Sequence, residues 1–211
     1  MMPKPTHAPG SRKSMLKGLF GRESVQGGNF VGMLDPSSGA IRLKQSPTSR
    51  SRPYGIVVNS EGIPFFCEFG TNKLAVISPD TMDITEFELP KGTRPRRLAI
   101  TADDMVYYTD FAQGRLGRLD PKTKKVEDWP SPGGGDSRPY GIAATAGGKV
   151  WYSESGLKPN TIVRFDPKTR TFETWPIPSC GGVVRHMVAT RTGDLYIASS
   201  GKNKVGIVKL H

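Results

Sequence analysis

The stretch Arg138–Trp175, RPYGIAATAGGKVWYSESGLKPNTIVRFDPKTRTFETW, decides the fold. It contains four short segments that are rich in β-branched and aromatic residues, a composition typical of β-strands. The predicted strands are Gly141–Thr145, Val150–Ser153, Thr161–Phe165 and Thr171–Trp175. Between the last two, Asp166-Pro167-Lys168-Thr169 predicts a tight turn, because proline sets φ and aspartate can bond the backbone beyond it.

The same unit recurs along the chain, most clearly in its third strand. That signature is present five times, as NFVGMLDP (29–36), NKLAVISP (72–79), GRLGRLDP (114–121), NTIVRFDP (160–167) and NKVGIVKL (203–210). The second strand recurs as FFCE (65–68), YYTD (107–110), WYSE (151–154) and YIAS (196–199). The prolines after the third strand, from Pro36 to Pro167, are 43, 42 and 46 residues apart. A four-strand repeat of this length predicts a β-propeller, because one twisted sheet cannot bury both of its faces alone and must stack on its neighbours.

The repeats predict an all-β propeller over residues 25–211, after a basic leader at 1–24. The leader has no apolar run long enough for a secretory signal, so we expect it to be disordered or loosely docked. The blades are antiparallel, and the expected units are a half blade (28–50), three complete blades (52–93, 94–137 and 138–182) and a three-stranded blade (183–210).

Counting these strands gives 17, one more than four closed blades need. Two arrangements fit the count: a closed four-bladed ring with one strand displaced, or an open arc of about four blades from a larger ring. We favour the incomplete ring, since propellers span four to eight blades. Open blade edges would then predict self-association.

Composition and charge exclude some partners. Hydrophobic residues make up 36% of the chain, with 25 Gly and 18 Pro, as suits many short strands joined by turns. There is no run of 18 apolar residues, so no membrane partner is expected. The net charge is +11, but residues 1–52 hold nine Lys/Arg against two acids, which leaves the repeats only mildly basic. Without a nucleic-acid fold signature, nucleic acid is not an expected partner.

The two cysteines occupy different places in different repeats. Cys67 stands where neighbouring copies have Thr109 and Ser153, which predicts a small buried residue. Cys180 lies in the glycine-rich connection SCGG. We therefore expect no disulfide and no redox pair.

The central channel is the expected site, because the first strand of each blade lines it. A small molecule or peptide in the channel would meet two sets of residues. Equivalent first-strand positions are Tyr54, Arg96, Tyr140 and His186, and the second strands end at Glu68, Asp110 and Glu154, with Ser199 and Ser200 in the last blade. We predict His186 as a general base and Arg96 as an anion stabiliser, with the tyrosines and carboxylates binding substrate. Structural roles remain open for all of them: a satisfied histidine, acids that bond a neighbouring blade, and tyrosines that fill the hub.

The combination of RPYGI, WYSE or YYTD, GRLGRLDP and ITEFELP resembles the streptogramin lyase (virginiamycin B lyase) family over residues 25–210. The resemblance implies a propeller, usually of six or seven blades. It implies linearisation of a cyclic depsipeptide by elimination across an ester C–O bond, with a histidine base and Mg²⁺ held by carboxylates. It also implies an extracytoplasmic location and an N-terminally truncated or divergent member.

By resemblance His186 matches the catalytic histidine, and Tyr140 matches a second, substrate-binding histidine. The positions implied for the Mg²⁺ carboxylates are Val184 and Ser199–Ser200, so we expect no metal here. Two hypotheses follow: a divergent C–O lyase or hydrolase at the channel, or a non-catalytic propeller that binds a peptide, glycan or protein on its rim. Convergence of the three carboxylates near His186 would favour the enzyme, and carboxylates pointing between blades would favour the scaffold.

Overall fold

The computed structural model describes residues 27–179 and 182–210 of the chain. These residues form antiparallel β-sheets, with only two short 3-10 turns, η1 (Gly135–Ser137) and η2 (Ser200–Lys202). The predicted all-β propeller fold is confirmed. No helix in the described part of the chain is long and apolar enough to cross a membrane. The leader and Cys180 lie outside the described residues.

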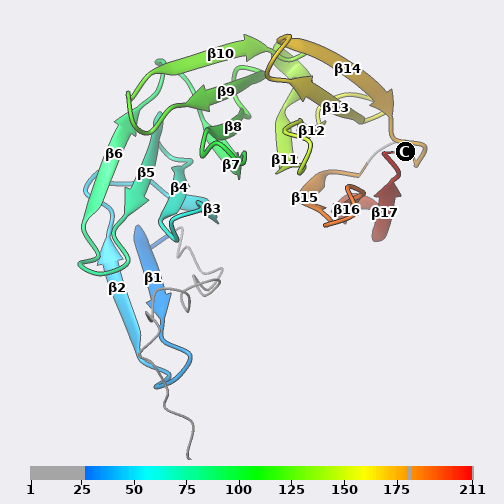
Figure 1. Cartoon of the computed structure of the whole chain (residues 1–211). Coiled ribbons are helices and arrows are strands. Elements are labelled where there is room, and N and C mark those ends of the chain that lie inside the picture. The colour runs from blue at the N-terminus through cyan, green and yellow to red at the C-terminus, as the bar shows by residue number, and fades with distance from the viewer. Residues whose placement is uncertain (1–26, 180–181, 211) are drawn as a thin grey trace, which may run out of the picture.

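Five sheets, which we call the first to fifth blades, follow one another along an open arc (Figure 1). Within each blade, strands adjacent in sequence are also adjacent in the sheet, so every blade is a meander. The first blade has β1 (Phe30–Leu34) and β2 (Ile41–Gln45). The second has β3 (Pro53–Val58), β4 (Pro64–Glu68), β5 (Lys73–Ile77) and β6 (Ile84–Glu88), and the third has β7 (Pro95–Ile100), β8 (Val106–Asp110), β9 (Arg115–Leu119) and β10 (Val126–Pro130). The fourth has β11 (Pro139–Ala144), β12 (Val150–Glu154), β13 (Thr161–Asp166) and β14 (Thr171–Pro176), and the fifth has β15 (Val184–Ala189), β16 (Leu195–Ser199) and β17 (Lys204–Val208).

The core is divided among the interfaces between successive blades, which we call seams. Adjacent residues of one strand serve different seams: Tyr108 packs with Phe65 of the second blade, and Tyr107 packs with Val163 of the fourth. Side chains alternate between the two faces of a strand, so every complete blade contributes to two seams. This alternation explains why the second strands are apolar at consecutive positions and fully buried.

Glycine allows the first strands of successive blades to approach closely at the hub. A Cβ added at Gly55 would lie 3.0 Å from the Arg96 carbonyl oxygen, and one added at Gly141 would lie 2.9 Å from the Val184 carbonyl oxygen. These contacts are tighter than ordinary van der Waals distances. Arg97 occupies the same position in the third blade, where the chain departs from the repeat.

A register shift near the start of each first strand corrects one sequence-based alignment. Pro139 lies opposite Glu154 in the fourth blade, and Val184 lies opposite Ser199 in the fifth. Arg185 is therefore the equivalent of Tyr140, and His186 is the equivalent of Gly141. The prediction that His186 is equivalent to Tyr54, Arg96 and Tyr140 is wrong by one residue. The fifth blade lacks the Arg-Pro pair that marks the register in the second, third and fourth blades.

Candidate functional site

The centre of the candidate site is Arg96, which lies among four aromatic rings at the inner side of the blades. We call Tyr54, Phe69, Arg96, Phe111 and Tyr140 the hub cluster. The Arg96 guanidinium carbon lies 4.1 Å from the ring centroid of Tyr140, 4.2 Å from Phe111, 4.7 Å from Phe69 and 5.5 Å from Tyr54. Three blades thus contribute to one cation–π cluster.

The repeat explains why these side chains meet. Tyr54, Arg96 and Tyr140 are each the second residue of a first strand, so three successive blades bring them to one hub. Phe69 and Phe111 directly follow the acid that ends β4 and β8. Sequence reasoning missed these two phenylalanines. The available signal was an aromatic residue after the acid in FFCEF and YYTDF, where the fourth blade has Ser155.

Hydrogen bonds join the two tyrosines to the arginine. The hydroxyl oxygens of Tyr54 and Tyr140 are 2.5 Å apart, and Arg96 Nη2 donates to the Tyr140 oxygen at 3.2 Å. Burial raises the pKa of Tyr54, and its bond to Tyr140 acts in the same direction. For Tyr140, burial also acts to raise the pKa, but the bonds from Tyr54 and Arg96 and the nearby positive charge outweigh it and lower the pKa.

Three more arginines surround the cluster. Arg94 lies over Phe69 at 4.3 Å, Arg97 over Tyr54 at 4.9 Å, and Arg138 over Phe111 at 6.0 Å. The salt bridges of the described residues include none from these arginines or from Arg96. The Nε atoms of Arg96 and Arg97 are buried without a hydrogen-bond partner among the described residues. The hub is thus cationic and aromatic, with donors left over.

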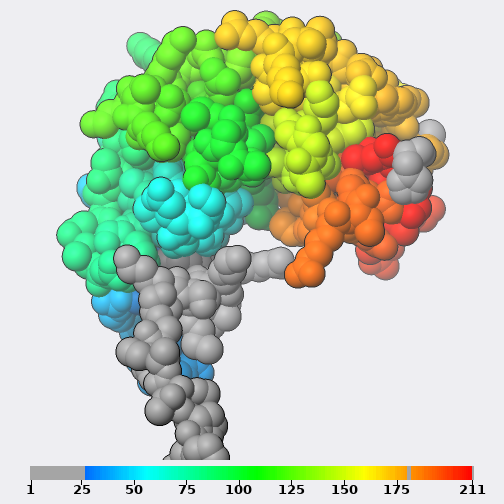
Figure 2. All heavy atoms as spheres, viewed as in Figure 1, coloured from blue at the N-terminus to red at the C-terminus, as the bar shows by residue number. Residues whose placement is uncertain are grey.

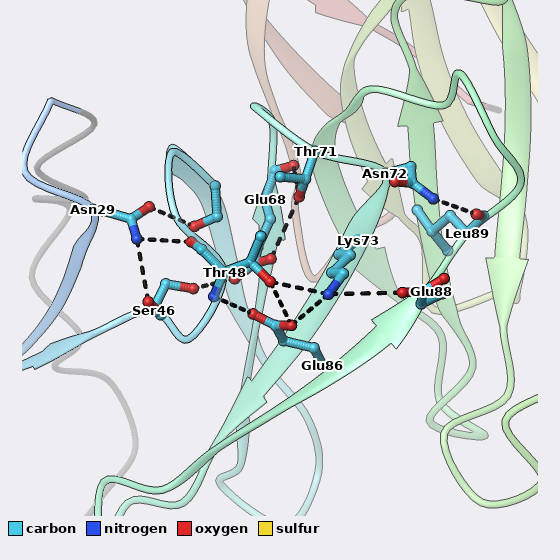
Figure 3. A network of polar contacts seen from close by, with 11 residues as sticks. Asn29, Ser46, Thr48, Glu68, Thr71, Asn72, Lys73, Glu86, Glu88 and Leu89 are labelled. Atoms are coloured by element: carbon cyan, nitrogen blue, oxygen red, sulfur yellow. Dashed lines mark hydrogen bonds and ion pairs between the residues drawn. The ribbon is translucent and has the colours of Figure 1, made fainter.

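Glu68, by contrast, lies in the seam between the first two blades (Figure 3). Its carboxylate accepts a hydrogen bond from the Ser46 hydroxyl, and the residue is fully buried. Burial raises the pKa of Glu68, while the bond from Ser46 acts to lower it. Below it in the same network, Lys73 Nζ lies 2.7 Å from Glu86 Oε2. These contacts connect the end of β2 to the second blade.

Asp110 and Glu154 occupy the same strand position in the next two blades and are also buried, at 1% exposure each. Asp110 Oδ1 accepts from the backbone N–H groups of Arg94, Ala112 and Gln113, at 3.0, 3.0 and 3.2 Å. Glu154 Oε1 accepts from Ser131 Oγ at 2.6 Å and from the Gly133 N–H at 2.7 Å, both in the connection that leaves the third blade. Each acid therefore holds connections in place at the start or end of a blade.

The three carboxylates do not form one group. None of them lines the small cavity beside His186, and each accepts bonds from groups in its own part of the ring. The substrate-binding role predicted for them stays a prediction. Their contacts are those of residues that fix blades and loops.

His186 lines a cavity of about 90 Å³ where the first strands of four blades meet. Arg97 lines the same cavity, whereas Arg96 belongs to the hub cluster. Arg97 is a candidate that sequence reasoning missed, and its signal was the second arginine in RPRRL, where the second and fourth blades have glycine. The apolar residues around them are Ile56, Val57, Leu98, Ile142 and Met187.

The positions implied for Mg²⁺ do not fit the ion. Val184 is aliphatic and fully buried. The Ser199 hydroxyl donates to the Gly182 carbonyl at 3.2 Å, and the Ser200 hydroxyl donates to the Val183 carbonyl at 3.0 Å. Magnesium prefers carboxylate oxygens and water in an octahedral shell, which this set does not supply. Among the described residues, no three His, Cys, Asp or Glu side chains gather in a way that could hold a metal.

Comparison with solved structures shows which known fold this is. A catalytically inactive variant of virginiamycin B lyase from Staphylococcus aureus, crystallised with quinupristin, superposes with a TM-score of 0.79 at 24% identity, over 88% of this chain and 61% of the lyase. The fold is that seen in streptogramin lyases. A further structure of a streptogramin B lyase gives a TM-score of 0.74 at 23% identity, over 88% of this chain and 63% of that one. The resemblance inferred from the sequence is confirmed for the fold, and identities this low show the fold alone.

A lactonase structure superposes less closely. A gluconolactonase from Xanthomonas campestris gives a TM-score of 0.62 at 16% identity, over 86% of this chain and 69% of that one. No protein-family model and no curated protein matches the sequence. The chain spans somewhat over three fifths of the length of the lyases it resembles.

Proposed function

We propose that this propeller binds an anionic small molecule or peptide at the hub cluster. The observation that carries the proposal is the environment of Arg96: a half-buried guanidinium among four rings, with no carboxylate partner in the described residues. Low-dielectric walls around a cation strengthen its attraction for an anion.

The rings alone do not satisfy the guanidinium. Aromatic faces attract its charge, but they offer no lone pairs to its five N–H donors. One of these donors bonds the Tyr140 oxygen, and Nε has no partner among the described residues. A carboxylate or phosphate would accept the remaining donors in the planar geometry that arginine favours. Phe69 and Tyr54 would then contact the apolar part of the ligand.

The test is a binding screen on the full chain with inorganic phosphate, citrate, aromatic carboxylates and acidic dipeptides. We expect at least one anion to bind with a dissociation constant that rises with salt, and Arg96→Gln to weaken it about tenfold or more. Arg191→Gln, in an exposed turn of the fifth blade, is the matched control. Failure of every anion to bind, or equal binding by Arg96→Gln, would overturn the proposal.

A second candidate is a C–O lyase or hydrolase, and the cavity shared by His186 and Arg97 favours it. Neutral imidazole would take a proton from the carbon next to the one that carries the ester oxygen. The electron pair left behind forms a C=C bond, the C–O bond breaks, and the carboxylate leaves with its negative charge toward Arg97. No metal is needed to balance this step. The solved structures with a similar fold include a virginiamycin B lyase and a gluconolactonase. Those activities belong to those proteins.

The assay is incubation of the chain with a cyclic depsipeptide, read by mass spectrometry. Elimination opens the ring with no change of mass, whereas hydrolysis adds one water. We expect weak activity or none, unaffected by EDTA, and any activity to be lost in His186→Ala and reduced in Arg97→Gln. Rapid turnover that a chelator abolishes would contradict the conclusion that the Mg²⁺ positions are unsuitable.

A further inference from the structure

The fifth blade exposes a position that the complete blades bury. In each blade, one third-strand residue pairs with the second-strand residue just before the last. These equivalent residues are Leu74, Leu116, Ile162 and Val205. Their exposed fractions are 0%, 0%, 4% and 75%. Val188, Tyr196 and Ile207 of the same blade are also exposed. The fifth blade thus carries an apolar surface of the kind that elsewhere packs against protein.

One edge of β17 is open as well. β17 pairs with β16, and no strand of the described residues pairs with its other side, at the end of the arc in Figure 1. Beside this edge is a cavity of about 730 Å³ between the fourth and fifth blades. Its apolar lining includes Trp151, Trp175, Ile177, Ile197, Val208 and Leu210. Figure 2 shows the two blades meeting at this side of the molecule.

The complete blades show what occupies the same place. There a fourth strand pairs with the third, and an apolar residue at or next to its first position packs into the seam with the preceding blade. These residues are Ile84, Val126 and Phe172, opposite Ile77, Leu119 and Phe165. The equivalent third-strand residue in the fifth blade is Val208, which lines the cavity. The cavity is therefore the place where the apolar residue at the start of a fourth strand would pack.

Charge indicates the chemistry of such a strand. Fourth strands carry acids that pair with bases of the third: Lys73 Nζ lies 2.7 Å from Glu86, and Arg115 Nη2 lies 2.6 Å from Asp128. Lys204 is the equivalent of Lys73 and Arg115 by register, and it is exposed. No salt bridge within the described residues joins Lys204 to a carboxylate. An incoming acid would supply that partner.

We propose that the open edge of β17 and the cavity beside it bind an extended acidic segment of another polypeptide. The segment has the pattern apolar, polar or acidic, acidic, aromatic, as in ITEF (84–87) and VEDW (126–129) of this chain. It adds antiparallel to β17 as a fourth strand, with the apolar residue opposite Val208, the aromatic residue opposite Val205 and an acid diagonal to Lys204. Main-chain hydrogen bonds supply affinity, and alternate side chains supply specificity.

The probe is a fluorescein-labelled peptide of residues 82–90, MDITEFELP, whose binding to the full chain is followed by anisotropy. We expect Lys204→Glu to weaken binding about threefold to fivefold, as for a partly exposed ion pair. A peptide with Glu86→Lys should bind Lys204→Glu better than it binds the unchanged chain. Replacing Ile84 of the peptide by Ala should weaken binding about tenfold, because its side chain fills the cavity.

Backbone methylation separates strand addition from simple apolar binding. Successive N–H groups of a strand point to opposite sides. Of two peptides methylated at alternate nitrogens, one should lose binding and the other should keep it. Equal binding by both, or by a scrambled peptide, would overturn the proposal. Sedimentation gives a second check. If the chain self-associates and saturating peptide does not reverse this, the proposal is also overturned, because a second copy of the chain would then cover the edge.

Discussion

The seams and the hub hold their charged side chains in opposite ways: the acids end second strands, and the arginines lie in a first strand. At the seams, Glu68, Asp110 and Glu154 are buried and accept hydrogen bonds from protein groups. At the hub, Arg96 and Arg97 are cations with buried donors that lack a partner in the described chain. Seam residues repeat from blade to blade, whereas Arg97 and the phenylalanines break or vary the repeat.

The difference separates structure from function in a repeat protein. A polar side chain that recurs at one strand position lies near the connections of its blade in each copy and accepts bonds from them, although Asp110 Oδ2 has no partner among the described residues. A side chain that departs from the pattern has no such partner built in. The bonded oxygens of the seam acids therefore predict effects on stability, and the unpaired donors of the hub arginines predict effects on ligand binding.

Asp110→Ala should produce the largest loss of stability. Its Oδ1 accepts three backbone N–H bonds, and alanine leaves those donors without an acceptor. We expect the free energy of unfolding in urea to fall by about 3 kcal/mol, whereas Asp110→Asn, which keeps one oxygen, should lose about 1 kcal/mol. Equal losses in the two variants would show that these bonds do not hold the loop.

Arg96→Gln should have a smaller effect on stability and a larger one on binding. It removes the cation from a half-buried aromatic cluster, for which we expect a loss of about 1 kcal/mol in urea. Binding of the anion found in the screen should weaken about tenfold or more in the same variant. A stability loss as large as that of Asp110→Ala would show that Arg96 has a structural role, like the seam acids.

Glu68 should make stability depend on pH in the acid range. Burial raises its pKa in the folded chain above the ordinary value of 4.5, so the folded state holds the proton more tightly than the unfolded state. The stabilisation linked to this proton is present below pH 4.5 and is lost as pH rises through the raised pKa. The free energy of unfolding in urea should fall as pH rises across this window in the unchanged chain. Glu68→Gln should not show this fall. An equal dependence of the free energy of unfolding on pH in both proteins would contradict the raised pKa of Glu68.

The sequence predicted the blades because each strand signature recurs in register. The third-strand copies placed β1, β5, β9, β13 and β17 correctly. The fifth blade was misaligned by one residue at His186, because a register shift in the backbone leaves no mark where the Arg-Pro pair is absent. Side chains that follow a strand, such as Phe69, were missed because their direction depends on packing between blades.

The sequence also did not predict that the carboxylates lie in the seams and the arginines lie at the hub. Glu68 and Arg96 each stand near the channel end of a strand, and pattern alone does not say which side chain turns into a seam. The outcome depends on partners from other blades, such as Ser46 for Glu68 and Tyr140 for Arg96. Those contacts are between residues far apart in the chain.

The smallest expected effect comes from Cys67→Ser. The equivalent hydroxyls bridge blades: Thr109 Oγ1 accepts from the Arg97 N–H at 3.2 Å and donates to the Tyr140 carbonyl at 3.0 Å. Ser153 Oγ makes the same two bonds, to the Gly141 N–H and the Val184 carbonyl, both at 3.1 Å. Cys67 is fully buried at this position, and burial raises the pKa of its thiol.

A serine hydroxyl at position 67 would therefore find the Gly55 N–H and the Arg96 carbonyl, since the second and third blades meet as the others do. We expect the free energy of unfolding in urea to change by less than about 1 kcal/mol. A buried hydroxyl without partners would instead lower the free energy of unfolding by about 1–3 kcal/mol. Leu74→Ser, opposite Cys67 in the same seam, is the control, because it creates a cavity and places a hydroxyl among apolar side chains. If both variants lose the same stability, the bridging hydroxyl is not a property of the seam, and the conclusion that repetition supplies partners for polar groups fails.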